Sequence, residues 1–365
     1  MSTGFVWDER FFWFDTGRAL PPIHGSEPYP AFDRPDTKRR IKSLLDVSGI
    51  LEHLTSIRPH PATREDLLRF HTAEYVDHVE ALSLGSGGDT GENAWIGPGD
   101  FPTALLAAGG AYSGLRAVLS GEVDNAYALL RPCGHHSTRE KGMGFAIFCN
   151  AALAIMRARD EGHLQRAAVV DWDVHHGNGT QEAFYDDPGV LTLSIHQDNC
   201  YPKDSGATSE RGEGAGFGAN INVPLPPGSG HGAYLATFDR VILPALERFA
   251  PDVVVVASGL DANGLDPLAR MMCHSGTYRD MTQRLLRFTA ERCKGRLLIC
   301  HEGGYSPIYV PFPALAIVEE LAGVSTEVFD PMQDFIASYG GQDEQPHQAA
   351  VIDAAAALVD DVPAP

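Results

Sequence analysis

Residues 167–181 read AAVVDWDVHHGNGTQ, so that four small or β-branched residues run directly into a cluster of Asp, His and Asn. A short, uninterrupted apolar run is typical of a strand that is buried on both faces, as in a parallel sheet covered by helices. Ligands of open α/β sheets bind at the carboxyl ends of the strands, because the loops there converge on one crevice. This stretch therefore predicts both a fold class and the edge of the sheet where a functional site lies.

Four other short apolar runs end in the same way. They cover Ala126–Leu130, Val190–Ile195, Val253–Ala257 and Leu297–Cys300, and are followed by RPCGHH, HQDNCYP, SGLDANGLDP and HEGGYSP. Longer amphipathic stretches at 150–161, 234–249 and 278–293 are interpreted as helices. We predict an α/β fold, a single domain with a mostly parallel central sheet and helices on both faces. Turns favour Gly, Asn and Asp but do not require paired His, so the repeated clusters favour a site.

The first hundred residues are less regular. Helical patterns at Thr37–Leu54 and Arg64–Leu82 follow a stretch rich in Pro and Gly at Ala19–Arg34. We expect this opening to pack on the body of the domain rather than to stand alone. Because no linker-like stretch or internal repeat interrupts the chain, we predict one catalytic domain over residues 1–365, with a core at about 35–323 and a C-terminal tail at 341–365.

Composition excludes several classes of protein. The 365 residues include 28 Lys and Arg against 48 Asp and Glu, a formal net charge of −20, with no basic stripe for a nucleic acid backbone. The opening lacks the pattern of a secretory signal, and no apolar run approaches the roughly 20 residues that cross a bilayer. The six cysteines are widely spaced, as in free thiols of a reducing compartment. We expect a cytoplasmic protein that binds neither nucleic acid nor membrane.

Asp173, His175 and Asp261 are the candidate metal ligands. Residues two apart in an extended segment point the same way, so Asp173 and His175 can face one ion. Asp261 ends the strongest apolar strand and would arrive at the same edge of the sheet. One imidazole and two carboxylates leave a position open for water and substrate, as catalytic sites do. These ligand types favour Zn²⁺, with Fe²⁺, Mn²⁺ and Co²⁺ left open.

The adjacent histidines His135 and His136 are candidates for acid and base catalysis. Each imidazole needs its own acceptor to fix its tautomer, and Asp171 and Asn178 are the candidate partners. A carboxylate raises the basicity of one imidazole more than a neutral amide raises the other, so the pair could divide the roles of base and acid. The alternative is a pair that only bridges backbone carbonyls.

Three aromatic residues follow the clusters. Tyr305 comes after a double glycine, and its phenol could donate a hydrogen bond to a polarised carbonyl oxygen. Phe145 and Tyr201 could form the walls of a narrow apolar channel, although isolated aromatics more often pack in a core. The sequence has neither a phosphate-binding GxxxxGK[ST] loop nor a GxSxG nucleophile, which argues against a serine hydrolase. We interpret Cys133 and Cys273 as structural.

In order and spacing, RPCGHH, GFAIFCN, DWDVHHGNGTQEAFY, SGLDANGLDPLA and EGGYSP resemble the zinc-dependent histone deacetylase family, specifically its class II branch with the bacterial histone deacetylase-like amidohydrolases. The likeness extends from Pro35 to Gly323. It implies the arginase-deacetylase fold and hydrolysis of an N-acetyl amide to acetate and a free amine.

The resemblance also implies roles for single residues. Zn²⁺ would be held by Asp173, His175 and Asp261, the acid/base pair His135 and His136 would be backed by Asp171 and Asn178, and Tyr305 would polarise the acetyl carbonyl. The substrate channel would include Gly144, Phe145, Tyr201, Leu268 and Gly303. One K⁺ or Na⁺ ion would lie near Asp171, Asp173, His175, Ser194 and Ile195, and a second near Phe184, Asp187 and Val190.

Departures from the family pattern bear on the substrate. Cys133 stands where class II relatives usually have Pro, and Tyr201 replaces a more usual Phe. Relatives specialised for polyamines place a Glu at the position of Leu268, so Leu favours acyl-lysine over an acetylpolyamine. Deacetylation of an acetylpolyamine or of another small-molecule acetylated amine stays the alternative. Rival functions are an arginase-like ureohydrolase, which needs further aspartates for two metal ions, and a non-catalytic binder. Related bacterial proteins tend to associate, so we expect a homo-oligomer, a dimer or tetramer.

Overall fold

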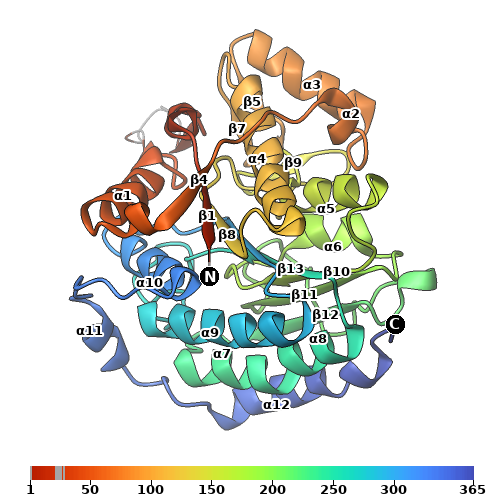
Figure 1. The fold of residues 1–365 in the computed structure, drawn as a ribbon. Helices are drawn as coiled ribbons and strands as arrows, with labels where there is room; N and C mark the ends of the chain where they lie inside the picture. Colours follow the sequence, from red (N-terminus) through yellow and green to blue (C-terminus); the bar gives the residue numbers. More distant parts are fainter. Residues whose placement is uncertain (1, 21–26, 28) are drawn as a thin grey trace.

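The computed structural model describes residues 2–20, 27 and 29–365. Its centre is one sheet with the strand order β12-β11-β10-β13-β14-β8-β1-β4, in which every neighbouring pair is parallel (Figure 1). The strands are β1 (Thr3–Val6), β4 (Leu54–Ile57), β8 (Asn125–Ala128), β10 (Ala167–Asp171), β11 (Val190–Gln197), β12 (Asn220–Leu225), β13 (Val253–Ser258) and β14 (Leu297–His301). The predicted α/β class and parallel sheet are confirmed.

Helices cover both faces of the sheet, and the side chains of the central strands alternate between two hydrophobic cores. Ala168 and Val170 of β10 belong to one core, whereas Ala167 and Val169 belong to the other. The first core packs under α1 (Pro35–Val47), α7 (His231–Thr237), α8 (Leu243–Phe249), α9 (Ser275–Arg292), α10 (Pro311–Ala322) and α12 (Pro346–Ala356). The second packs under α3 (Ala73–Leu84), α4 (Phe101–Ser120), α5 (Asn150–Asp160) and α6 (Asn178–Phe184). Burial on both faces explains why these strands are uninterrupted apolar runs.

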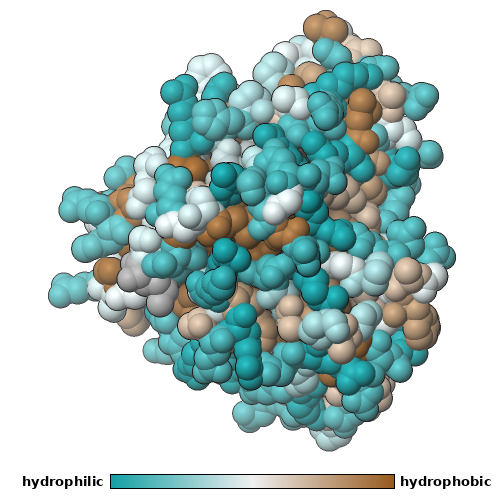
Figure 2. All heavy atoms as spheres, turned by 45° about the vertical axis from the view of Figure 1, so that its right-hand side comes forward, coloured by the Kyte–Doolittle hydropathy of each residue, from teal (hydrophilic) through white to brown (hydrophobic). Residues whose placement is uncertain are grey.

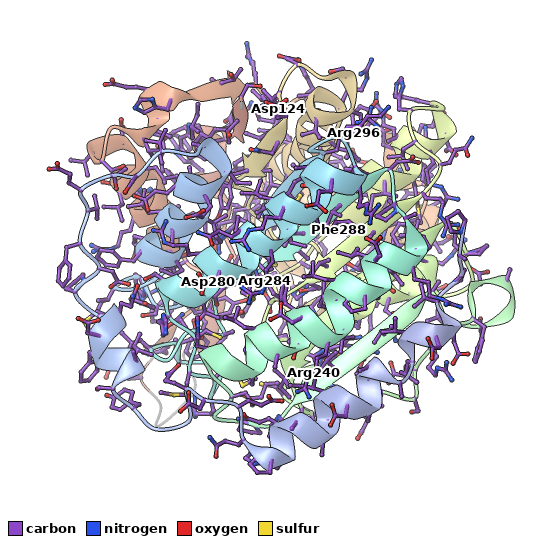
Figure 3. All side chains as sticks on the ribbon, turned by 60° about the horizontal axis from the view of Figure 1, so that its bottom comes forward. Asp124, Arg240, Asp280, Arg284, Phe288 and Arg296 are labelled. Atoms are coloured by element: carbon purple, nitrogen blue, oxygen red, sulfur yellow. The ribbon has the colours of Figure 1, made fainter. Side chains whose placement is uncertain are left out.

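Ion pairs join the outer helices. Arg284 of α9 pairs with Asp239 at 2.7 Å, and Arg240 pairs with Asp353 of α12 at 2.7 Å. Figure 3 shows Arg240 and Arg284 on this helical layer.

The turn between α7 and α8, Phe238–Ile242, is π-helical, so the predicted helix at 234–249 is nearly continuous. A different face, seen in Figure 2, is mostly hydrophilic with hydrophobic residues gathered near its centre.

The opening of the chain packs on the body, as expected, because β1 pairs with both β4 and β8. The helix predicted at Thr37–Leu54 ends earlier, at Val47, because Gly49 adopts a left-handed conformation with φ of 78°. The helix predicted at Arg64–Leu82 is two helices, α2 (Arg64–Leu67) and α3, and the Thr72 side chain caps the second. Within the predicted loop at 19–34, residues 21–26 and 28 lie outside the described residues.

The C-terminal tail docks on the body of the same chain. Ile352 and Ala355 of α12, followed by Val362, are buried in the first hydrophobic core, and α11 (Gln333–Ala337) precedes them. The six cysteines are free thiols, as predicted. Among the described residues, every helix is too short or too polar to cross a membrane.

Candidate active site

The loops that carry the predicted site follow strands that are neighbours in the sheet, in the order β10, β13, β14 and β8. The chain forms these strands in a different order, with β8 first and β14 last. The insertion of β13 and β14 between β10 and β8 therefore brings residues from distant parts of the sequence to one edge. The residues on these loops are His135, His136, Asp173, His175, Asp261 and Tyr305.

Asp173, His175 and Asp261 form a buried group in which one potential ligand atom of each residue lies within 4.8 Å of the others. His175 Nδ1 lies 3.0 Å from Asp173 Oδ1 and 3.2 Å from Asp261 Oδ2. Ligand atoms around a tetrahedral Zn²⁺ lie about 3.3 Å apart, since each bond measures about 2.0 Å. The spacing of the three side chains therefore fits a single small cation.

Backbone donors fix the carboxylates of this group. Val174 N–H donates to Asp261 Oδ1 at 2.9 Å, and Gly303 N–H donates to Asp173 Oδ2 at 2.9 Å. Asp261 Oδ2 is fully buried and, among the described residues, accepts no well-aligned hydrogen bond, although His175 Nδ1 lies 3.2 Å away. A buried carboxylate oxygen without a well-aligned donor is costly, so this atom also indicates a cation site.

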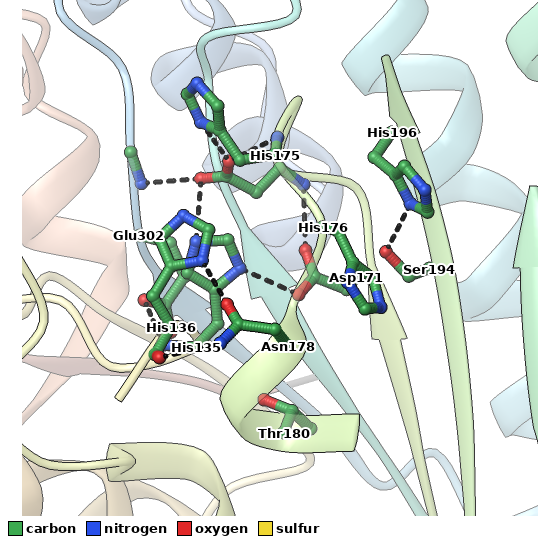
Figure 4. Close-up of polar contacts among 12 residues, drawn as sticks. His135, His136, Asp171, His175, His176, Asn178, Thr180, Ser194, His196 and Glu302 are labelled. Carbon is green, nitrogen blue, oxygen red and sulfur yellow. Dashed lines mark hydrogen bonds and ion pairs between the residues drawn. The ribbon is translucent and has the colours of Figure 1, made fainter. Parts of the chain in front are cut away.

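Different groups lie behind the two histidines (Figure 4). His135 Nδ1 contacts Asp171 Oδ2 at 2.9 Å, and His136 Nδ1 contacts Asn178 Oδ1 at 2.8 Å. Burial opposes charge on both rings, but Asp173 and Asp171 raise the pKa of His135 to about 10. Burial, together with His135 and His175, holds the pKa of His136 well below its usual value. The ring centres lie only 4.0 Å apart, yet the two imidazoles have pKa shifts of opposite direction.

Tyr305 lies beside the group, with its ring centre 6.4 Å from that of His175 and 5.6 Å from that of Phe145. Its N–H donates to Asp266 Oδ2 at 2.8 Å, which fixes the backbone of its loop. Burial and the Asp261 carboxylate raise the pKa of the phenol well above its usual value. The hydroxyl therefore stays protonated and can donate a hydrogen bond.

A cavity of about 370 Å³ leads to these residues. Its wall includes the predicted channel residues Gly144, Phe145, Tyr201 and Leu268, together with His136, His175, Tyr305, Cys200, Trp95, Phe32, Ala31, Thr16, Arg18, Asp89 and Asn93. Gly303 lies elsewhere, beside Asp173, and is outside this lining of described residues. Gly144 has a φ of +51°, and a Cβ there would approach His136 to 2.5 Å, so glycine keeps the channel open beside the imidazole.

The residues predicted to hold monovalent cations fall in two places. Asp171 and Ser194 are paired neighbours on β10 and β11, directly before Ile195, and Ser194 Oγ contacts His196 Nδ1 at 2.9 Å. Phe184, Asp187 and Val190 form successive backbone hydrogen bonds after α6. The Asp187 side chain pairs with Arg159.

Sequence reasoning missed two buried carboxylates of the site. Asp266 accepts the N–H groups of Tyr305 and Leu268, and Glu302 accepts those of Gly134 and His135. Each lies in a quoted motif, GLDP or HEGG, but the sequence does not show that these side chains bind backbone. The position of Glu302 directly after a strand was the available signal.

A buried ion cluster beneath the site was also missed. Asp33 pairs with Lys38 at 2.8 Å and with Arg131 at 2.9 Å. Arg131, directly before the loop of the His pair, is fully buried. These ion pairs connect the opening of the chain to the strand end that carries the histidines.

Comparisons with known proteins agree with this geometry. The sequence matches the histone deacetylase domain family over residues 32–321. It is 51% identical to a histone deacetylase-like amidohydrolase of Pseudomonas aeruginosa, over 92% of this chain and 90% of that protein. It is 37% identical to histone deacetylase 8 of Arabidopsis thaliana, over 84% and 82% of the two chains. The crystal structure of the HDA15 HD domain is similar, with a TM-score of 0.86 and 30% identity, and the match covers 99% of this chain and 94% of that one.

Proposed function

Because this chain belongs to the histone deacetylase family and is a deacetylase, we propose that it uses a bound metal ion to remove acetyl groups from the side-chain amine of lysine. The observation that carries the proposal is the buried group Asp173, His175 and Asp261, of which His175 lines the cavity. Zn²⁺ is our first choice for the ion because one imidazole and two carboxylates suit it, and Fe²⁺ and Mn²⁺ accept the same donors.

The residues around the cavity suit hydrolysis of an amide. A bound metal ion would polarise the acyl carbonyl and lower the pKa of a water molecule. His136 has a lowered pKa, which favours its neutral form, and lines the cavity, so it can take a proton from the attacking water. His135 lies beside it and is held by Asp171, and Tyr305 can donate a hydrogen bond to the oxygen that becomes negative. We propose that the imidazolium formed on His136 then protonates the departing amine. Asp171 and Asn178 would orient the two histidines.

The cavity wall favours acyl-lysine over an acetylpolyamine. Leu268 gives the wall an apolar side chain where a cationic chain needs a carboxylate. Asp89 lies at the cavity, but its carboxylate already accepts the N–H groups of Gly91, Asn93 and Ala94. Arg18 also lines the cavity and would repel a second ammonium group.

Other parts of the assignment rest on the sequence. We propose structural K⁺ or Na⁺ ions at the two places given above, a homo-oligomeric protein and a cytoplasmic location. Ser194 beside Asp171 supports the first ion, because both side chains offer oxygen atoms. The ion pair between Asp187 and Arg159 leaves backbone carbonyls as the donors for the second.

Rate measurements with and without metal test the proposed function. Purified protein is assayed on an acetyl-lysine peptide and on N-acetylputrescine, before and after chelator treatment and after return of Zn²⁺, Fe²⁺ or Mn²⁺. We expect the chelator to abolish hydrolysis, metal to restore it, and kcat/KM to favour the peptide by about tenfold or more. Full activity after chelation would contradict the proposed metal dependence. A preference for N-acetylputrescine would contradict acyl-lysine as the substrate.

A further inference from the structure

Glu302 is buried at the point where two loops of the site meet. Its side chain is 1% exposed, and Oε2 accepts the N–H of Gly134 at 2.6 Å and that of His135 at 3.2 Å. Its own N–H donates to the carbonyl of Ser258 at 3.0 Å, which fixes the residue to the end of β13. Figure 4 shows Glu302 beside the two histidines. One side chain thus joins the loop after β14 to the loop after β8.

The same loop is held firmly on its other side. Gly303 N–H binds Asp173, and Tyr305 N–H binds Asp266 at 2.8 Å. The chain from Glu302 to Tyr305 is therefore fixed at three points, and its first point holds the backbone of His135. Gly134 is equally confined, since a Cβ there would lie 2.6 Å from the N atom of Asn150.

Burial of the Glu302 carboxylate, taken by itself, lowers the stability of the folded state. Burial raises the pKa of Glu302 to about 7, even though His135 opposes the shift. A buried carboxylate loses its hydration, and two backbone donors replace only part of it. A functional role for the contact of Glu302 with Gly134 and His135 would explain why a carboxylate that is unfavourable to bury stands at this position.

We propose that Glu302 is a positioning residue, which holds the His135–His136 pair at a fixed separation from the Tyr305 hydroxyl. This inference rests on the proposed function, because it concerns groups that act on the same amide. A general base and a hydrogen-bond donor on opposite sides of one carbonyl carbon must both be aligned, and misplacement by about 1 Å can cost about a hundredfold in rate.

Both N–H groups bind the same oxygen of Glu302, so Glu302→Gln can keep both contacts through its amide oxygen. Glu302→Ala removes them. We expect Glu302→Ala to lower kcat by about 10- to 100-fold with KM nearly unchanged, and Glu302→Gln to stay within about threefold of the parent. Equal losses in the two variants would overturn the proposal, because they would assign the effect to charge.

A double-mutant cycle with Tyr305→Phe separates positioning from general stability. If Glu302 acts by aligning the His pair with the Tyr305 hydroxyl, Glu302→Ala should cost less than about threefold in the Tyr305→Phe background. The same loss in both backgrounds would overturn the proposal. If Glu302→Ala does not fold, Glu302→Asp takes its place in the cycle, since its carboxylate is one methylene shorter.

Metal content and parent activity are measured in the same preparations. Failure of the proposed function would appear as a parent protein that does not hydrolyse the acetyl-lysine peptide or does so without metal. Failure of the positioning role would appear as equal losses in Glu302→Ala and Glu302→Gln, or as additive losses in the cycle, in an active, metal-dependent enzyme. The two failures are therefore distinguishable.

Discussion

The backbone N–H of Gly303 donates a 2.9 Å hydrogen bond to Oδ2 of Asp173. This bond joins the loop after β14 to the loop after β10, although β13 lies between these strands in the sheet. A side chain at position 303 would overlap Oδ2 of Asp261 and lie 2.6 Å from Oδ2 of Asp173. The two carboxylates can face one ion only because residue 303 is glycine.

We therefore expect Gly303→Ala to lose the metal ion, because the added methyl group displaces at least one carboxylate. Elemental analysis should find well under half of the parent's metal per chain, with activity reduced in parallel. Gly340→Ala is the control, since among the described residues no atom lies within 4 Å of a Cβ built there. A fully metallated Gly303→Ala protein would contradict the close packing of this site.

Tyr305→Phe removes one hydroxyl and should lower kcat by about 100- to 1000-fold, the usual cost of losing one donor to a developing oxyanion. Metal content should not change, because the phenol lies outside the group Asp173, His175 and Asp261. Tyr201→Phe is the matched control. Tyr201 lines the cavity, but its hydroxyl donates to the exposed Glu92 at 3.4 Å, so we expect kcat within about threefold of the parent. An unchanged rate in Tyr305→Phe would exclude its role.

Leu268→Glu should shift the substrate preference toward N-acetylputrescine. A carboxylate in the channel wall can bind the second ammonium group, and such a contact contributes about 1.5 kcal/mol or more, or about tenfold. The measurement is the ratio of kcat/KM values for N-acetylputrescine and the acetyl-lysine peptide. Leu268→Gln, which is neutral, should leave the ratio near that of the parent. The same shift in both variants would rule out a charge effect.

His71 should make the fold sensitive to acid. It is buried between the carbonyl of Thr138, 3.0 Å from Nδ1, and the N–H of Cys149, 3.1 Å from Nε2. Burial lowers the pKa of His71 to about 3. In the unfolded chain the pKa of His71 is about 6.5. Below that pH the unfolded chain therefore binds a proton at His71 that the folded chain does not bind.

The stability that His71 contributes near neutral pH is consequently lost between about pH 6.5 and pH 3. We expect the free energy of unfolding in urea to fall from pH 7 to pH 5 by about 2 kcal/mol more in the parent than in His71→Gln. Glutamine lacks the titratable ring but can donate and accept hydrogen bonds. Identical pH dependence in the two proteins would show that His71 does not titrate on unfolding.

Much of the site could be predicted because its residues directly follow strands with a clear pattern. Asp173 and His175 end a buried apolar run, and Asp261 follows another, so the rule for the carboxyl edge of a parallel sheet placed them together. The apolar runs also predicted burial on both faces, which the division of Val169 and Val170 between two cores confirms.

The remaining features depend on contacts between distant segments. The strand Thr3–Val6 is short and lies in an aromatic-rich opening, so only its pairing with β4 and β8 reveals it. Neither the insertion of β13 and β14 between β10 and β8 nor the contact of Glu302 with Gly134 has a local signal. Burial of Arg131 likewise depends on Asp33, which arrives from the opening of the chain.

The most direct test of the account is the metal content of the parent protein and of Asp261→Asn, measured beside deacetylation of the acetyl-lysine peptide. The substitution keeps the shape of the side chain and changes one oxygen of the predicted ion site. We expect one transition-metal ion per parent chain, and a variant that loses both metal and activity together. An Asp261→Asn protein that holds no metal yet remains fully active would contradict the account.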